Sequence, residues 1–365
     1  MRIVTIACWL VTALALAGVA VWFLTGTVFG MGQGGWNANW LTGFGIGGWA
    51  LFSGPYSEAT EYSHGTAGVE SLNIDWVAGE VTVKPYDGSD FKITESAQRG
   101  LDENERLQIS ESGGTLTIKY ARRNGLLRLP PKKLEVLVPQ ALSENLGALS
   151  ADTVSSPVVI EGIGADTLKA NSTSGSIRIS NCAAQALSMK STSGSLTMAG
   201  VHADSMNIGS TSGAIHISGS SAKTLDCSTT SGRADVSGAF DSVKQGSVSG
   251  RLLLDNTAPA SDLEANSTSG ALELSGSFDK VNAKSVSGRL DIRSTILPGS
   301  LKANTTSGSI NIAIPGEAAV TVDHSSVSGS FSSAVPVIMQ KTGAQFKLSS
   351  ISGSIRINQM NNTLK

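Results

Sequence analysis

The tetrapeptide Ser/Thr-x-Ser-Gly recurs ten times in the chain and constrains its fold more than any other feature of the sequence. The intervals between its glycines run from 18 to 24 residues. Self-similarity at such a period is the signature of repeat architectures, in which each unit packs against its neighbours. The glycines, predicted to form structural corners, are Gly175, Gly194, Gly213, Gly232, Gly250, Gly270, Gly288, Gly308, Gly329 and Gly353.

Apolar residues keep fixed distances from each of these glycines. With the glycine as position zero, position −7 is apolar in every copy, from Leu168 to Phe346, and position −6 is polar. Position +2 is again apolar, from Ile177 to Ile355. This alternation predicts two strands per repeat, each with one buried face, joined at a tight corner. Because one repeat cannot enclose a core, the sequence predicts an all-β fold, a parallel β-solenoid with coils of about 19 residues.

The residues around the corner carry further expectations. Glycine is expected where the backbone is left-handed or too crowded for a Cβ atom. Ser at −1 and Ser or Thr at −3 are expected to point inward as a polar ladder that fixes the coil register. Position −2 is expected to point outward, and in the first four copies it is Thr173, Thr192, Thr211 and Thr230. These threonines are a candidate binding strip for an ordered polymer, a glycan or ice; alternatively, β-branched residues stand there because they favour strands.

The start of the chain predicts a membrane anchor. Ile3 to Leu24 carries no charge and, as a helix, covers roughly the 30 Å of bilayer hydrocarbon. A cleaved signal peptide is the alternative, but its small-residue triplet, Ala15 to Ala17, lies inside the apolar run. Arg2 places the N-terminus in the cytoplasm and the solenoid outside the cell membrane, which the chain spans once.

Composition changes predict the domain boundaries. We expect a transmembrane signal anchor at 1–28, a Gly/Trp-rich tether at 29–64, and a degenerate β-solenoid or cap region at 65–165. Regular solenoid repeats follow at 166–358, then a C-terminal tail at 359–365. The repeat template also fits around Gly79 and Ser156, so the solenoid is expected to begin near Leu72.

Charge and cysteine content exclude several functions. The formal net charge of −2 provides no basic field, so nucleic acid is not an expected partner. The three cysteines form no CxxC pair and no His cluster accompanies them, so no metal site is expected. A GxGxxG stretch at Gly43 to Gly48 lacks the flanking strand and helix of a dinucleotide site. We therefore expect no cofactor.

Outward acids are the main argument for an enzyme. β-Helix lyases and hydrolases use clustered carboxylates, or a carboxylate with Arg or Lys, from adjacent coils. Here Asp235 and Glu273 share position +3 two coils apart, and Asp291 follows in the next coil. Arginines at position +1 stand among them, so a solvated face with surface ion pairs is the expected interpretation, and no catalytic residues are assigned.

Three segments in this order, Val77 to Val83, Leu134 to Pro139 and Ser172 to Ile179, resemble the bacterial DUF4097 putative adhesin family of β-strand repeat proteins. The resemblance covers about residues 69–358. It implies a surface-exposed role, sometimes alongside cell-envelope stress systems, and offers no catalytic residues. We therefore predict a non-enzymatic, membrane-anchored, adhesin-like binding or scaffolding protein. Its partners would be the membrane, through the N-terminal helix, and an envelope glycan or another surface protein. The alternative is a carbohydrate-active β-helix enzyme acting on an envelope or extracellular polysaccharide.

Overall fold

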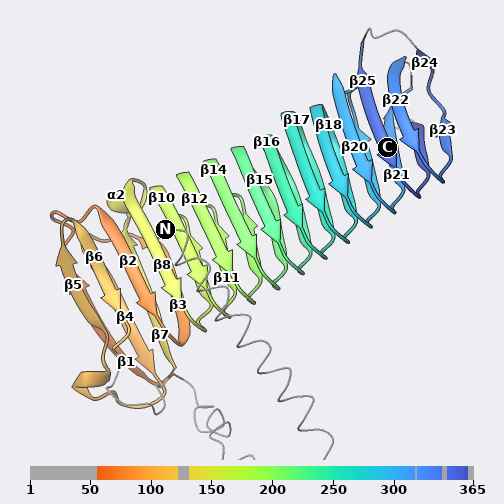
Figure 1. Ribbon diagram of the computed structural model, residues 1–365. Helices are drawn as coiled ribbons and strands as arrows, with labels where there is room; N and C mark the ends of the chain where they lie inside the picture. Colours follow the sequence, from red (N-terminus) through yellow and green to blue (C-terminus); the bar gives the residue numbers. More distant parts are fainter. Residues whose placement is uncertain (1–55, 122–130, 317–318, 339–342, 361–365) are drawn as a thin grey trace, which may run out of the picture. The chain divides into compact units, whose positions relative to one another are not determined.

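The computed structural model describes residues 56–121, 131–316, 319–338 and 343–360, all within one of the chain's two compact units, residues 54–365. In these ranges no helix has the length and apolar character needed to cross a membrane. The predicted anchor at Ile3 to Leu24 lies outside the described residues. The fold is all-β, with a long and mostly parallel sheet of stacked coils (Figure 1).

Each coil consists of two strands joined at the glycine corner, as the alternation predicts. In one coil, β10 (Gly164–Ser172) buries Leu168 and Ala170, and β11 (Ile177–Ser180) buries Ile177 and Ile179. β10 pairs in parallel with β8 (Leu146–Thr153) and β12 (Ala183–Ser191). β11 pairs with β9 (Val158–Glu161) and β13 (Leu196–Ala199). The strands before the corner therefore form one face, here called face one, and those after it form face two.

The inward side chains of both faces belong to one continuous hydrophobic core. The strand register aligns equivalent positions of successive coils, so Leu168 lies beside Leu149 on one side and Leu187 on the other. After β14 (His202–Ser210), face two of one coil continues directly into face one of the next. The long strands that do so are β15 (Ile215–Thr229), β16 (Ala234–Ser247), β17 (Leu252–Ser267) and β18 (Leu272–Ser285).

At the C-terminal end the coils do not stack in sequence order. β19 (Leu290–Ser294), β20 (Ser300–Thr305) and β21 (Ile310–Pro315) continue the stack. The next coil in space is the last in sequence, β25 (Gln345–Ser350) and β26 (Ile355–Met360). Outside it lie β22 (Val320–Ser326) and β23 (Phe331–Ser333), with β24 (Val337–Ile338) pairing to β22.

The N-terminal end shows the same inversion. β2 (Ser71–Trp76) lies between β6 (Thr115–Lys119) and β8, and β3 (Gly79–Tyr86) lies between β7 (Lys132–Pro139) and β9. The first coil in sequence is therefore second in space, which the repeat template does not predict. Antiparallel strands complete this end, because β4 (Phe91–Ala97) pairs with β7 and with β1 (Glu58–His64), and β5 (Gln108–Ser112) pairs with β6. β1 lies in a segment expected to be tether, and β26 extends two residues into the expected tail.

A buried ion pair, which no sequence pattern indicates, lies at this N-terminal end. Nζ of Lys132 lies 2.6 Å from Oε1 of Glu95, and both side chains are fully buried. Lys132 also donates to the carbonyl of Glu105, at the end of a short 3-10 helix (Glu103–Glu105), and lies 4.0 Å from the centroid of the Tyr120 ring. Desolvation lowers the pKa of Lys132, while its hydrogen bond to Glu95 opposes that shift. A short helix, α2 (Gln140–Ser143), follows β7.

Candidate functional site

The corner is held by a side-chain hydrogen bond that repeats from coil to coil. The hydroxyl of Ser191 at position −3 accepts a 2.8 Å hydrogen bond from the backbone N–H of Gly194. A Cβ atom on Gly194 would overlap the carbonyl oxygen of Gly175 in the preceding coil. The backbone at these corners is not left-handed, so crowding alone requires glycine there. All ten corner glycines meet a neighbouring coil's carbonyl in this way.

The serine at position −1 points outward, contrary to the expected inward ladder. Ser193 is exposed whereas Ser191 is buried, because the chain bends through the corner and the strand alternation ends there. The backbone N–H of Ser193 donates to the carbonyl of Thr173 in the preceding coil. Equivalent bonds run along the whole stack, so the corner backbone itself forms the ladder.

Position −2 forms an exposed column that follows this ladder, here called the corner column. In spatial order it consists of Val154, Thr173, Thr192, Thr211, Thr230, Val248, Thr268, Val286, Thr306, Ile351 and Val327. All are exposed and β-branched, at a coil spacing of about 4.8 Å. Of the seven exposed large apolar side chains in the described ranges, five belong to this column. Methyl groups are therefore gathered along one line of the surface.

A groove of about 440 Å³, here called the corner groove, runs beside part of the corner column. One side is formed by column residues Thr230, Val248, Thr268 and Val286. Position −4 also lines the groove, with the small residues Ser228 and Gly246 in two coils and Asn266 and Lys284 in the next two. Of the four predicted threonines, Thr230 lines this corner groove and the other three do not. The sequence offers a signal for it, namely the small residues at position −4.

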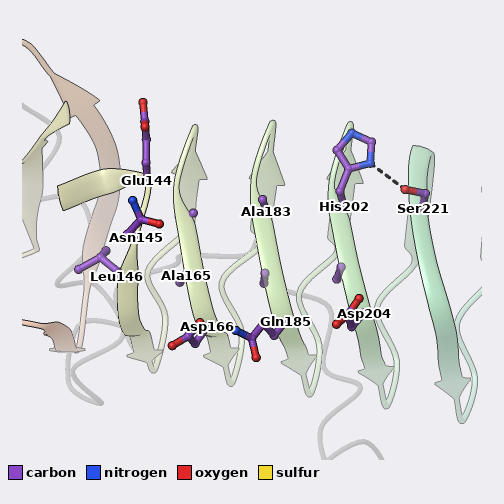
Figure 2. A pocket seen from close by; sticks show the side chains of 13 residues that line it. Glu144, Asn145, Leu146, Ala165, Asp166, Ala183, Gln185, His202, Asp204 and Ser221 are labelled. Atoms are coloured by element: carbon purple, nitrogen blue, oxygen red, sulfur yellow. Dashed lines mark hydrogen bonds between the residues drawn. The ribbon is translucent and has the colours of Figure 1, made fainter. Parts of the chain in front are cut away.

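A second groove, of about 570 Å³, crosses face one at the start of β10, β12 and β14 (Figure 2). Alanines contribute much of its lining, and polar residues flank them. Nδ1 of His202 lies 2.7 Å from the hydroxyl of Ser221. The nearby acids have other partners, since Gln185 donates to Asp166 and Lys223 pairs with Asp204. No Ser-His-acid triad is therefore formed by the described residues of this groove.

A pocket of about 270 Å³ lies on the outward surface of face two. It brings together Glu273 and Asp291, which are direct neighbours in the β18–β19 register, with Arg289 and Arg293. Arg251 lies 2.5 Å from Glu273, and this hydrogen bond raises the pKa of the Arg251 guanidinium. We call this the acid–arginine pocket. The three arginines at +1 all pair with acids, as expected, but two of the acids expected to be scattered lie together.

The buried cysteines and the metal-ligating residues form no reactive centre in the described ranges. Burial raises the pKa of the Cys227 thiol to about 12, and burial also raises the pKa of Cys182. Both thiols are protonated at neutral pH, a form that neither attacks nor binds metal well. No cluster of three or more His, Cys, Asp or Glu residues suited to a metal ion occurs among the residues that the structure describes.

Stacked parallel coils with a repeated corner and outward columns define a β-solenoid repeat protein. The family model described as Toastrack DUF4097 matches residues 69–275 and 234–360, which together are more than half of the chain. The chain belongs to this family.

Comparison with solved structures finds distant similarity. A "putative adhesin" from Parabacteroides distasonis ATCC 8503 is 15% identical, with a TM-score of 0.38, over 83% of this chain and 98% of that chain. A "putative lipid binding protein" from the same organism is 16% identical, with a TM-score of 0.38, over 83% and 96%. A "putative adhesin" from Parabacteroides merdae ATCC 43184 is 14% identical, with a TM-score of 0.36, over 82% and 96%. No curated protein matches the chain.

Proposed function

We propose that this protein is a membrane-anchored, adhesin-like binding or scaffolding protein of the bacterial cell surface, and that the corner column is its contact surface. The observation that carries the proposal is the concentration of exposed apolar residues on this one line. Gathered exposed apolar surface marks interaction sites in soluble domains, and four of the five large apolar members of the column lie between Val248 and Val327 in spatial order, interspersed with threonines. Membership of the DUF4097 family agrees with a surface role.

The physical character of the column favours an extended ligand. Hydroxyl and methyl groups repeat at the coil spacing of about 4.8 Å, so a polymer lying along the stack meets the same chemistry again and again. The corner groove adds a hollow with Asn266 and Lys284 beside the column. A glycan of the cell envelope presents hydroxyls and apolar ring faces that match these groups.

Retention of the full-length protein on immobilised neutral and acidic envelope polysaccharides tests this function. Thr192→Val with Thr211→Val keeps the shape and β-branching but deletes two hydroxyls. A specific loss of retention with unaltered thermal unfolding supports the column as the binding surface. If the folded variant is retained as well as the parent protein, these threonines have a structural role only.

The proposed location rests on the charge-free run from Ile3 to Leu24. Protease added to intact cells or spheroplasts should degrade the solenoid while the anchor stays with the membrane. Full protection of the solenoid, or a released protein that begins after Ala17, would contradict the anchored arrangement.

A carbohydrate-active enzyme is the second candidate, and the acid–arginine pocket favours it. Glu273 and Asp291 are register partners in adjacent coils, and a pair of carboxylates on neighbouring positions is the group that glycosidases use. Both carboxylates are engaged, however, because Arg251 pairs with Glu273 and Asn311 donates a 2.7 Å hydrogen bond to Asp291. New reducing ends or unsaturated products that disappear in Glu273→Gln would establish catalysis.

A further inference from the structure

The acid–arginine pocket lies on face two, away from the corner column. Its position follows from the strand register, in which Ser275 lies beside Arg293 of the adjacent coil and Glu273 lies beside Asp291. Side chains at these outward positions therefore converge from adjacent coils. Arg289 reaches the same pocket from position +1 of the β19 coil.

One arginine of this pocket has no acidic partner in the described ranges. Arg251 pairs with Glu273, and Arg289 pairs with Asp291 at 3.9 Å. Arg293 also lines the pocket and has no ion pair among the residues that the structure describes. Two arginines and two carboxylates line the pocket, and because Arg251 also pairs with Glu273 from outside it, the Arg293 guanidinium is left without a carboxylate partner in this described part of the chain. A guanidinium presents paired N–H donors that match a carboxylate.

An apolar side chain completes the pocket. Leu253 stands at position +3, where the neighbouring coils carry Asp235 and Glu273. It points outward and lines the pocket, while Leu252 and Leu254 on either side of it are buried in the core. The pocket therefore combines an apolar wall, an anion receptor and two carboxylate acceptors.

We propose that the acid–arginine pocket binds a carboxylate-bearing sugar residue of an acidic polysaccharide. Arg293 pairs with the carboxylate of the sugar, and Leu253 packs against the apolar face of the ring. Glu273 and Asp291 accept hydrogen bonds from ring hydroxyls, held in place by Arg251 and Asn311. The proposal does not depend on the corner column, because the two surfaces share no residue.

Binding of an oligogalacturonate and of a size-matched neutral oligosaccharide to the full-length protein, measured by calorimetry, tests the proposal. The acidic oligomer should bind and the neutral one should bind far more weakly. Arg293→Gln should reduce acidic binding about tenfold or more, the loss expected for a charge-assisted hydrogen bond. Arg293→Lys retains the positive charge but lacks the paired N–H donors. Its affinity for the acidic oligomer should lie between those of the parent protein and Arg293→Gln.

The matched control is Arg178→Gln, which removes an exposed arginine at position +3 on β11, outside the pocket. It should leave binding unchanged. Equal binding of acidic and neutral oligomers, equal effects of the two glutamine variants, or no binding of the acidic oligomer would overturn the proposal. Acetate binding as tight as the sugar would overturn recognition of the ring. Thr192→Val with Thr211→Val should not alter this binding. A failure of the pocket proposal can therefore be distinguished from a failure of the proposed function of the corner column.

Discussion

The hydroxyl of Ser210 accepts a 2.8 Å hydrogen bond from the backbone N–H of Gly213, three residues later, and both residues are buried. The hydroxyl thereby satisfies a donor at a point where the strand has ended. Close approach of the preceding coil explains the glycine, because a Cβ atom on Gly213 would overlap the carbonyl oxygen of Gly194. These two contacts explain the Ser or Thr at position −3 and the glycine at position zero.

Gly213→Ala should destabilise the protein by about 3 kcal/mol or more, because the added Cβ atom overlaps a backbone carbonyl that cannot move without distorting the adjacent coil. Thermal or urea unfolding measures the change. Gly65→Ala is the control, since nothing lies within 4 Å of a Cβ atom there. Equal stability of the two variants would contradict crowding as the reason for glycine.

Ser210→Ala should cost about 1–3 kcal/mol, because the buried N–H of Gly213 loses its acceptor. Ser212→Ala, at the exposed position −1 of the same corner, should change the free energy of unfolding by less than about 0.5 kcal/mol. The pair therefore tests which serine is structural. A larger cost at Ser212 would restore the inward ladder that the sequence predicts.

Gln245 is fully buried at position −5, and neither its amide nitrogen nor its amide oxygen has a hydrogen-bond partner among the described residues. In the two adjacent coils, the residues at the same inward position are Cys227 and Ala265. Gln245→Met keeps the length of the side chain and removes both polar atoms, so it should stabilise the protein by about 1–3 kcal/mol. A fall in the unfolding temperature would show that the amide is satisfied in solution.

Lys132→Met should cost about 3–5 kcal/mol, because the fully buried Glu95 side chain would lose its ion-pair partner. Lys133→Met is the matched control on the same strand, since Lys133 pairs with Glu80 at the surface and should contribute at most about 1 kcal/mol. Adding Glu95→Leu to Lys132→Met should recover much of the loss. Without such recovery, the cost would be one of packing rather than of an unpaired charge.

The stacking itself could be predicted from sequence, because apolar positions such as Leu168 and Ile177 recur at fixed distances from the glycine. The order of the end coils could not. Leu301 finds equivalent partners in Val281 and Phe346, and any coil carrying the same apolar columns would fit equally well. The repeat pattern therefore does not determine which coil lies next to which.

Some features of the candidate sites could likewise be predicted from the sequence, and others could not. The outward column at position −2 follows from parity, and the structure places all four predicted threonines on the surface. The inward assignment of position −1 was wrong because parity does not continue through a bend. The Lys132–Glu95 pair joins residues far apart in sequence that follow no repeat, so no pattern could reveal it. The adjacency of Glu273 and Asp291, by contrast, follows from the coil register, and only their convergence with Arg293 needed the structure.

The most direct test of the central claim compares two sets of exposed apolar residues of similar exposure. Val248→Ser with Val286→Ser removes two apolar side chains from the corner column, which are 47% and 48% exposed, and Ile296→Ser with Val337→Ser removes two elsewhere, which are 43% and 40% exposed. Retention of the full-length variants on the envelope polysaccharide that binds the parent protein is then measured. We predict a loss of about tenfold or more for the column variant only, with unfolding unchanged, as expected when buried apolar contacts of about 1.4 kcal/mol or more are removed from an interface. Equal retention of the two variants, or an equal loss in both, would contradict the corner column as the contact surface.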